Sequence, residues 1–438
     1  MLRQMSESCK KFYRYCLAFT GSDGAVLLLG RIILLGNAFI ISIYLLKKFG
    51  LGAVGTYTLA NVAVVSLSLF CGLGLNYSLP RESLTNLQRN TVALVWSGLL
   101  APISLALIVA YAVIMAQHRL EVWEISLFAT AGFFCGITNV ANTLFIMQNR
   151  TYLSLIFPLV HTVGLLLGMI YSQTLFHFAI FLMAFRALGA TIPFCFLNYA
   201  RIRIFKIWDC GIQGFLYFPP DMLATLSEQS GPVILSFLLS RGELGVFGLC
   251  RQVLTAGEFP CWSFLQSIYP QLVRTRLASV REFQRQNIRL SVLVAVLVLA
   301  GSFVLGFFIY HLPNFAYMMI PLVLVIPFKY DNCFYDQVIK SVGKIRLNII
   351  LNVIKFLVAI PLFAIMGKTL GVWGAIIGVA VLAMFSDFLY RKPGSSLFPP
   401  PAEVNPRSCA LSQVQVQVQE PLLNVVTIYS KDNGNIVG

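Results

Sequence analysis

The stretch GTYTLANVAVVSLSLFCGLGLNYSLPR, residues 55–81, has a counterpart in GVFGLCRQVLTAGEFPCWSFLQSIYPQLVR, residues 245–274. Gly55 aligns with Gly245, and Pro80 aligns with Pro270, so that both alignments use an offset of 190 residues. A constant offset at both ends of a long stretch indicates an internal repeat. The sequence therefore predicts two halves with the same order of elements.

The composition is that of a membrane protein. Of the 438 residues, 58% are hydrophobic and only 11% are charged, and the mean hydropathy is +0.79. Ordinary soluble domains contain about 25% charged residues. Repeated apolar runs are each long enough to cross a hydrocarbon core of about 30 Å, and we count about twelve of them. The predicted spans are 24–46, 53–75, 91–115, 123–147, 153–174, 176–199, 222–240, 246–271, 288–311, 314–338, 347–367 and 370–390.

The distribution of Lys and Arg predicts the orientation of the chain. One set of alternate connections, counted with the N-terminal segment, contains 20 Lys and Arg residues, and the other set contains five. The positive-inside rule places the richer set, and with it both termini, in the cytoplasm. This bias also accounts for the net charge of +15, which therefore needs no nucleic-acid partner.

The repeat and the spans together predict the domain organisation. Because each half contains six spans, the two repeats are parallel and related by an axis along the membrane normal. We expect an all-α polytopic membrane protein with about 12 transmembrane helices. The predicted segments are a cytoplasmic N-terminus at 1–23, a first six-helix lobe at 24–199, a cytoplasmic inter-lobe linker at 200–221, a second six-helix lobe at 222–390 and a disordered cytoplasmic tail at 391–438.

The sequence resembles a known family in the repeated stretches. LLKKFGLGAVGTYTLANVAVVSLSLFCGLGLNYSLPRE, residues 45–82, and its echo SRGELGVFGLCRQVLTAGEFPCWSFLQSIYPQLVR, residues 240–274, resemble the bacterial O-antigen and capsule oligosaccharide flippases of the MOP exporter superfamily. The resemblance implies two six-helix bundles around a central cavity in the bacterial inner membrane. It also implies translocation of a polyprenyl-pyrophosphate-linked oligosaccharide from the cytoplasmic to the outer leaflet. H⁺ or Na⁺ is the expected coupling ion, and a polysaccharide polymerase and chain-length proteins are the expected protein partners.

Charged residues inside the predicted spans are candidates for the site. A charge at mid-bilayer costs at least about 2.5 kcal/mol on insertion scales, so such residues usually face a cavity or the bundle interior. The predicted substrate-binding cations are Arg31, Arg186, Arg251, Lys329 and Lys355, and the predicted ion-coupling acids are Glu228, Glu258, Asp331 and Asp336.

Helical spacing indicates which of these charges share a face. Seven residues advance a helix by nearly two full turns, so Lys329 aligns with Asp336, whereas Asp331 points roughly the other way. By the same spacing Arg251 aligns with Glu258, either in a cavity or as a structural pair. We expect Lys329 and Asp336 to line the cavity, although Lys329 and Arg31 have the alternative of reaching the membrane interface.

Several other residues give narrower expectations. Gly231-Pro232 is expected to break the seventh helix, and Pro321 and Pro327 are expected to bend the tenth, because proline removes a backbone donor. His161 is expected to be a hydrogen-bonded core residue. Asp387, at the end of the last span, is expected to be solvated.

Other functions find less support in the sequence. The ten cysteines include no CxxC pair, and no metal-ligand set, cofactor motif or nucleophile with a base stands out, so we expect no enzyme. A membrane-embedded polysaccharide polymerase or transferase would need an aqueous site on a substantial loop, and the outward connections are short. The nearer alternative is a cation-coupled multidrug exporter of the same superfamily. Its relatives commonly carry an acid in the first helix, where this chain has Arg31.

Overall fold

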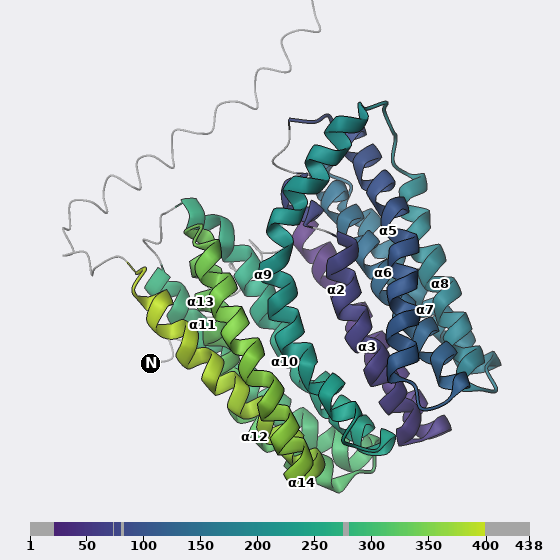
Figure 1. Ribbon diagram of the computed structural model, residues 1–438, viewed down its shortest axis with the longest axis vertical. Coiled ribbons are helices and arrows are strands. Elements are labelled where there is room, and N and C mark those ends of the chain that lie inside the picture. Colours follow the sequence, from purple (N-terminus) through teal and green to yellow (C-terminus); the bar gives the residue numbers. More distant parts are fainter. Residues whose placement is uncertain (1–21, 73, 80–82, 275–279, 399–438) are drawn as a thin grey trace, which may run out of the picture. The chain divides into compact units, whose positions relative to one another are not determined.

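The computed structural model describes residues 22–72, 74–79, 83–274 and 280–398 (Figure 1). The predicted N-terminal segment before residue 22, the Pro80-Arg81 part of the repeat and the predicted tail beyond residue 398 lie outside the described residues. All regular structure in the described ranges is helical, and these ranges contain no strand. The predicted all-α fold class is confirmed.

The first lobe contains the helices up to residue 195. Its elements are α2 (Ser22–Phe49), α3 (Leu51–Gly72), the short α4 (Leu75–Ser78), α5 (Asn86–Met115), α6 (Arg119–Met147), the 3₁₀ turn η1 (Thr151–Leu155), α7 (Ile156–Tyr171) and α8 (Leu175–Cys195). Helix α5 begins with a capping box, in which the side chains of Thr85 and Gln88 each accept a hydrogen bond from the other residue's backbone N–H.

The second lobe repeats this order. Its elements are α9 (Ile204–Ser236), α10 (Arg241–Arg274), α11 (Val280–Val304) with the π-helical η2 (Leu305–Ile309), α12 (Pro313–Leu324), α13 (Ile326–Ser341) and α14 (Ile345–Ser395). Gly371 divides α14 into two passes, because its φ of 59° is a left-handed conformation that glycine adopts readily. The pair α12–α13 covers the predicted tenth span, so the lobe has helices at all six predicted spans.

Eight helices in the described ranges are long and apolar enough to cross a membrane. They include the 50-residue stretch Arg346–Ser395, which holds both passes of α14. The helices α9, α10 and α12–α13 fall outside this group. Together they carry six of the nine predicted site charges, and α12 and α13 are separated at Val325.

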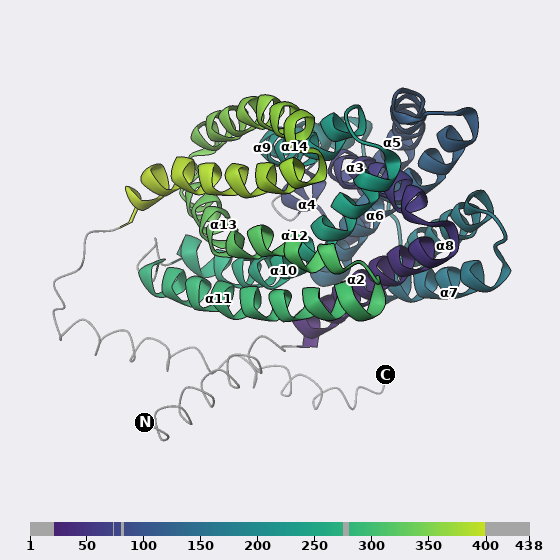
Figure 2. The ribbon, with the colours of Figure 1, turned by 90° about the horizontal axis from the view of Figure 1, so that it is seen from below.

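Helices α3 and α10 pack against each other and lie between the outer helices of the two lobes (Figure 2). A Cβ atom on Gly55 would overlap the carbonyl oxygen of Arg241, and one on Gly245 would overlap the carbonyl oxygen of Leu51. Leu51 and Arg241 are themselves related by the 190-residue offset, as are the two glycines. The contact is therefore reciprocal, as in an interface between two copies of one subunit. It holds the lobes together where α3 and α10 begin, which we call the closed end.

The structure corrects two expectations for the seventh span. Helix α9 begins at Ile204 rather than at residue 222, so most of the predicted inter-lobe linker is helical. It also continues through Pro232 without the expected break. Gly231 lets the ring of Phe363 on α14 come so close that a Cβ atom would lie 2.9 Å from it. The packing of α9 against α14 keeps this region helical even though the proline removes one hydrogen bond.

The ends of two other helices also bear on the predictions. The expected distortion of the tenth span is confirmed near Pro327, because the helix is interrupted at Val325, two residues before it, whereas α12 continues through Pro321. Helix α14 extends to Ser395, so the first residues of the predicted disordered tail are helical. Asp387 is 4% exposed and paired with Arg391, so the expectation that it is solvated was wrong.

Candidate functional site

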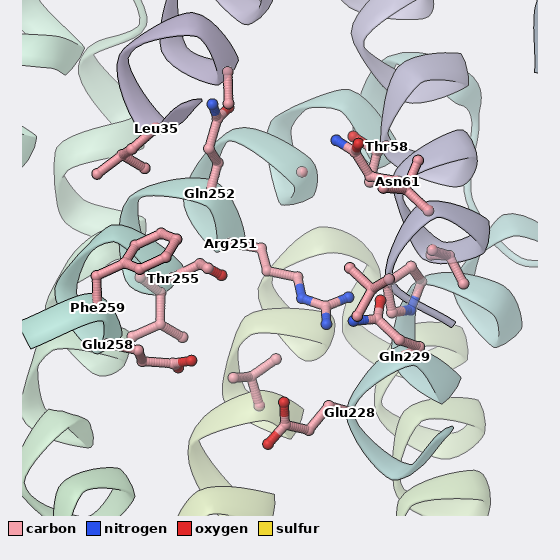
Figure 3. Close-up of a pocket in the computed structure, with 18 of the residues that line it drawn as sticks. Leu35, Thr58, Asn61, Glu228, Gln229, Arg251, Gln252, Thr255, Glu258 and Phe259 are labelled. Carbon is pink, nitrogen blue, oxygen red and sulfur yellow. The ribbon is translucent and has the colours of Figure 1, made fainter. Parts of the chain in front are cut away.

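A cavity of about 520 Å³ lies between the two lobes. Its walls come from α2, α3, α6, α7 and α8 of the first lobe and from α9, α10, α13 and α14 of the second. Figure 3 shows the part of the cavity where Arg251 extends from α10 toward Gln229. The cavity is thus lined by helices of both lobes that are far apart in the sequence.

Six of the nine predicted site charges line this cavity. They are the cations Arg186, Arg251, Lys329 and Lys355 and the acids Glu228 and Glu258. With all six ionised, the lining carries an excess of two positive charges. Because charges are costly to remove from water, a cluster of this kind is maintained by mutual pairing, by water in the cavity or by a charged ligand.

Two ion pairs neutralise the acids. Lys329 on α13 pairs with Glu258 on α10, and both side chains are largely buried. Lys355 on α14 pairs with Glu228 on α9 at 3.3 Å between Nζ and Oε1. Each pair joins two different helices of the second lobe. The alternative of an Arg251–Glu258 pair is not realised, since Glu258 is bound by Lys329.

The two arginines remain without a carboxylate partner. In the described part of the chain, neither Arg251 nor Arg186 forms an ion pair. Arg186 instead donates from Nε to Nε2 of His161 at 3.1 Å. His161 also contacts the amide of Asn37 on α2 at 3.4 Å, which agrees with the expected hydrogen-bonded core role. The positive excess of the cavity therefore resides on Arg251 and Arg186.

Three predicted site residues lie outside the cavity lining. Arg31 is half-buried on α2, several residues before the first lining residue of that helix. Asp331 faces α11 and the end of α14, where Gln284 and Arg391 bind it. Asp336 accepts from Asn348 at 2.7 Å and pairs with Lys340 at 2.8 Å.

The expectation that Lys329 and Asp336 line the cavity together was thus wrong for Asp336. The two residues share a helix face, but the last cavity-lining residue of α13 is Cys333. Beyond it, α14 packs against this face and supplies Asn348. Helical spacing predicts which residues share a face, but it does not predict how far the cavity extends along that face.

Sequence reasoning missed the neutral polar residues of the lining. They include Asn61, Gln229, Gln252 and Asn332, together with the aromatic residues Tyr57 and Trp262. Ser42 on α2 donates to Oε1 of Gln252 on α10 at 2.6 Å, which makes a hydrogen bond between the lobes. The repeat offered a signal, since Asn61 is offset by 190 residues from Arg251 and both residues line the cavity.

A buried ion pair joins the lobes at the closed end. Nε of Arg241, the first residue of α10, lies 2.7 Å from Oε1 of Glu121 on α6. Thr56 on α3 donates to the same oxygen at 3.0 Å, and the backbone N–H of Gln117 donates to Oε2 at 2.6 Å. Arg241 also donates to the carbonyl oxygen of Met115. These contacts and the reciprocal glycine packing close one end of the space between the lobes.

No family model and no curated protein matches the sequence. Solved structures do match. The lipid II flippase MurJ in an inward closed conformation has a TM-score of 0.69 at 12% identity, over 86% of this chain and 88% of that one. The chain has the fold of MOP superfamily transporters. An inward-facing MATE family multidrug resistance transporter of that superfamily matches with a TM-score of 0.63 at 13% identity, over 83% and 95% of the two chains.

A third match concerns the polarity of the pocket. A MOP superfamily transporter from Pyrococcus furiosus, described as having a binding pocket of reverse polarity that suggests a different function, has a TM-score of 0.61 at 13% identity, over 86% of this chain and 96% of that one. These neighbours are transporters and a flippase rather than enzymes. Identities this low establish the fold and leave the substrate to be argued from this chain's own cavity.

Proposed function

We propose that this protein is a flippase that moves a polyprenyl-pyrophosphate-linked oligosaccharide, such as an O-antigen or capsule repeat unit, across the bacterial inner membrane. The observation that carries the proposal is the positive excess in the cavity between the lobes. An anionic group bound there would pair with Arg251, whose guanidinium lacks a carboxylate partner among the described residues. Arginine suits this role because its planar fork can hold two phosphate oxygens at once.

The rest of the lining suits a sugar. Asn61, Gln229 and Gln252 offer amide donors and acceptors, and Trp262 and Tyr57 offer ring faces beside them. Sugars present hydroxyl groups to such amides and apolar C–H faces to such rings. The lipid chain would stay in the bilayer while the headgroup occupies the cavity.

Alternating access is the mechanism that we propose for these two lobes. By the positive-inside prediction, the closed end with Arg241 and Glu121 is the outer end, so the cavity would load from the cytoplasm. Rocking of the lobes would then open the outer end. Outward movement of negative charge is favoured by the membrane potential by about 2.3 kcal/mol per elementary charge for each ~100 mV. Glu228 and Glu258 are the acids placed to take up a coupling H⁺ or Na⁺ when the substrate releases their lysines.

The test is a flipping assay in proteoliposomes with a fluorescent polyprenyl-pyrophosphate oligosaccharide. We expect Arg251→Ala to reduce the flipping rate by about tenfold or more, since one charged hydrogen bond to phosphate contributes about 1.5–3 kcal/mol. Arg251→Lys should retain part of the rate. Lys368→Ala, which removes an exposed cation outside the cavity, is the control. Full activity of folded Arg251→Ala would contradict the proposal.

A multidrug exporter is the second candidate, and one observation favours it. Glu228 and Glu258 both face the cavity, where carboxylates could bind a cationic drug. One structural neighbour is a MATE multidrug transporter solved in complex with a ligand. Export of a cationic dye that is lost in Glu228→Gln but retained in Arg251→Ala would support this candidate over the flippase.

A further inference from the structure

A second group of buried charges lies in the second lobe, apart from the cavity. Asp331 on α13 and Asp387 on α14 are 5% and 4% exposed. One nitrogen of Arg391, Nη2, lies 3.1 Å from Oδ2 of Asp331 and 2.9 Å from Oδ2 of Asp387. None of these three residues lines the cavity. We call Asp331 and Asp387 the carboxyl pair.

The other groups around the carboxyl pair are neutral. From α11, Gln284 donates through Nε2 to Oδ1 of Asp331 at 3.2 Å and to the hydroxyl oxygen of Tyr335 at 2.9 Å. Among the described residues, the titratable or charged groups that contact the pair or its partner Gln284 are Tyr335 on α13 and Arg391 on α14. With both carboxyl groups ionised, one arginine would face two negative charges, and an uncompensated charge would remain buried.

One atom of the pair lacks a partner. Oδ1 of Asp387 is buried and makes no hydrogen bond within the described residues. Because Nη2 of Arg391 binds one oxygen of each carboxyl group, the carboxyl groups of Asp387 and Asp331 lie side by side. A buried carboxylate oxygen without a donor is costly, and two neighbouring carboxylates avoid this cost by sharing a proton. A proton on the pair would supply the missing donor and balance the charge of Arg391.

We infer that Asp331 and Asp387 share one proton at neutral pH and form a proton-binding site separate from the cavity. Arg391, which is 56% exposed, places this site next to the solvent at the end of α14, where protons can be exchanged. The positive charge of Arg391 favours a proton over a metal cation, which would need more oxygen ligands and would be repelled. As a consequence that rests on the proposed function, loss of the proton would set two carboxylates against each other between α13 and α14. It would thereby alter the helix that carries Lys329 into the cavity.

The primary test does not depend on transport. Infrared difference spectra of the purified full-length protein should show a protonated carboxyl band at about pH 7, well above the pKa of a free carboxyl group. We expect the band to be lost in Asp387→Asn and also in Asp331→Asn, because the remaining carboxylate is then balanced by Arg391. Asp336→Asn is the matched control on α13, since Lys340 and Asn348 already bind both of its carboxylate oxygens.

The outcomes separate this inference from the proposed function. Absence of the band in the wild type, or its persistence in folded Asp387→Asn, would overturn the shared proton. Removal of the band by sodium at constant pH would also overturn it, because the pair would then be a metal-cation site. If the band behaves as expected but the wild type flips no lipid-linked sugar, the proton site stands and the proposed function fails. If both hold, the flipping rate should lose its pH dependence in Asp387→Asn.

Discussion

The ion pair at the closed end makes a prediction about the balance between the conformations of the protein. Glu121 is 2% exposed, and its carboxylate accepts hydrogen bonds from Arg241, Thr56 and the backbone N–H of Gln117. Glu121→Gln keeps the size of the side chain and one acceptor oxygen but removes the negative charge. Arg241, with only 11% of its side chain exposed, would then lie at the lobe interface without a counter-charge.

The size of the effect follows from this burial. Removing one partner of a buried ion pair costs about 3 kcal/mol at the lower end of measured values, and the retained acceptor oxygen of glutamine favours that end. The cost applies to the state in which the closed end is formed and is relieved when Arg241 reaches water. Because about 1.4 kcal/mol corresponds to a tenfold change in an equilibrium constant, the ratio of closed to open protein should fall about a hundredfold.

Spin labels across the closed end would measure this shift. Arg119 of the first lobe and Lys368 of the second are exposed, so cysteines can replace them. The exposed Cys195, the half-buried Cys135 and Cys333, and the cysteines at positions 9, 16 and 409 outside the described residues are first changed to serine. We expect a short label-to-label distance in the otherwise unaltered protein and a longer, broader distribution in Glu121→Gln.

The matched control is a second acid at the same end. Glu243→Gln should leave the distances unchanged, because Glu243 is exposed and bonds to Ser240 of its own lobe. Unchanged distances in well-folded Glu121→Gln would refute the reasoning, as would an equal change in Glu243→Gln.

Other contacts in the structure lead to three more predictions. The Cβ atom of Leu51 lies 3.9 Å from the position of a Cβ atom on Gly242, so the double variant Leu51→Cys, Gly242→Cys should form a disulfide on oxidation. Oxidation should stop flipping and reduction should restore it, whereas oxidation should not change flipping by either single-cysteine variant. Lys329→Ala and Glu258→Gln should each lower the abundance of the protein in the membrane, because each leaves a buried charge without its partner, and the double variant should restore the abundance. Quantitative blotting measures this, and an equal decrease in all three variants would exclude the pairing. Truncation after Phe398 should leave the flipping rate intact, because the compact helical unit ends at Leu397; inactivity at normal abundance would assign the tail a role.

Much of the fold could be predicted from the sequence because lipid constrains it strongly. A span must be long and apolar, and a repeat must obey one offset, so the helices and the two lobes follow from local patterns. The start of α9 did not follow. Its first turns contain Lys206 and Asp209 among apolar residues, and this mixture resembles a connection when the neighbouring helices are unknown.

The site was predictable only in part, for a physical reason. Charged residues within spans are candidates for the site because burying a charge is costly, and six of the nine candidates line the cavity. Which charges meet depends on how helices pack. Lys329 is bound by Glu258, 71 residues earlier, and Asp336 by Asn348 across a turn, and no spacing rule on a single helix contains those contacts.

The repeat also explains how one framework can hold an unequal charge distribution. Residues 61 and 251 occupy equivalent places in the two lobes, and so do residues 68 and 258; the first lobe has Asn61 and Ser68 where the second has Arg251 and Glu258. The glycine contacts at the closed end are instead alike in both lobes. Packing at the closed end is therefore symmetric between the lobes, whereas the cavity wall is not. An asymmetric substrate, with phosphates at one end and sugars at the other, is the kind of ligand that such a wall would recognise.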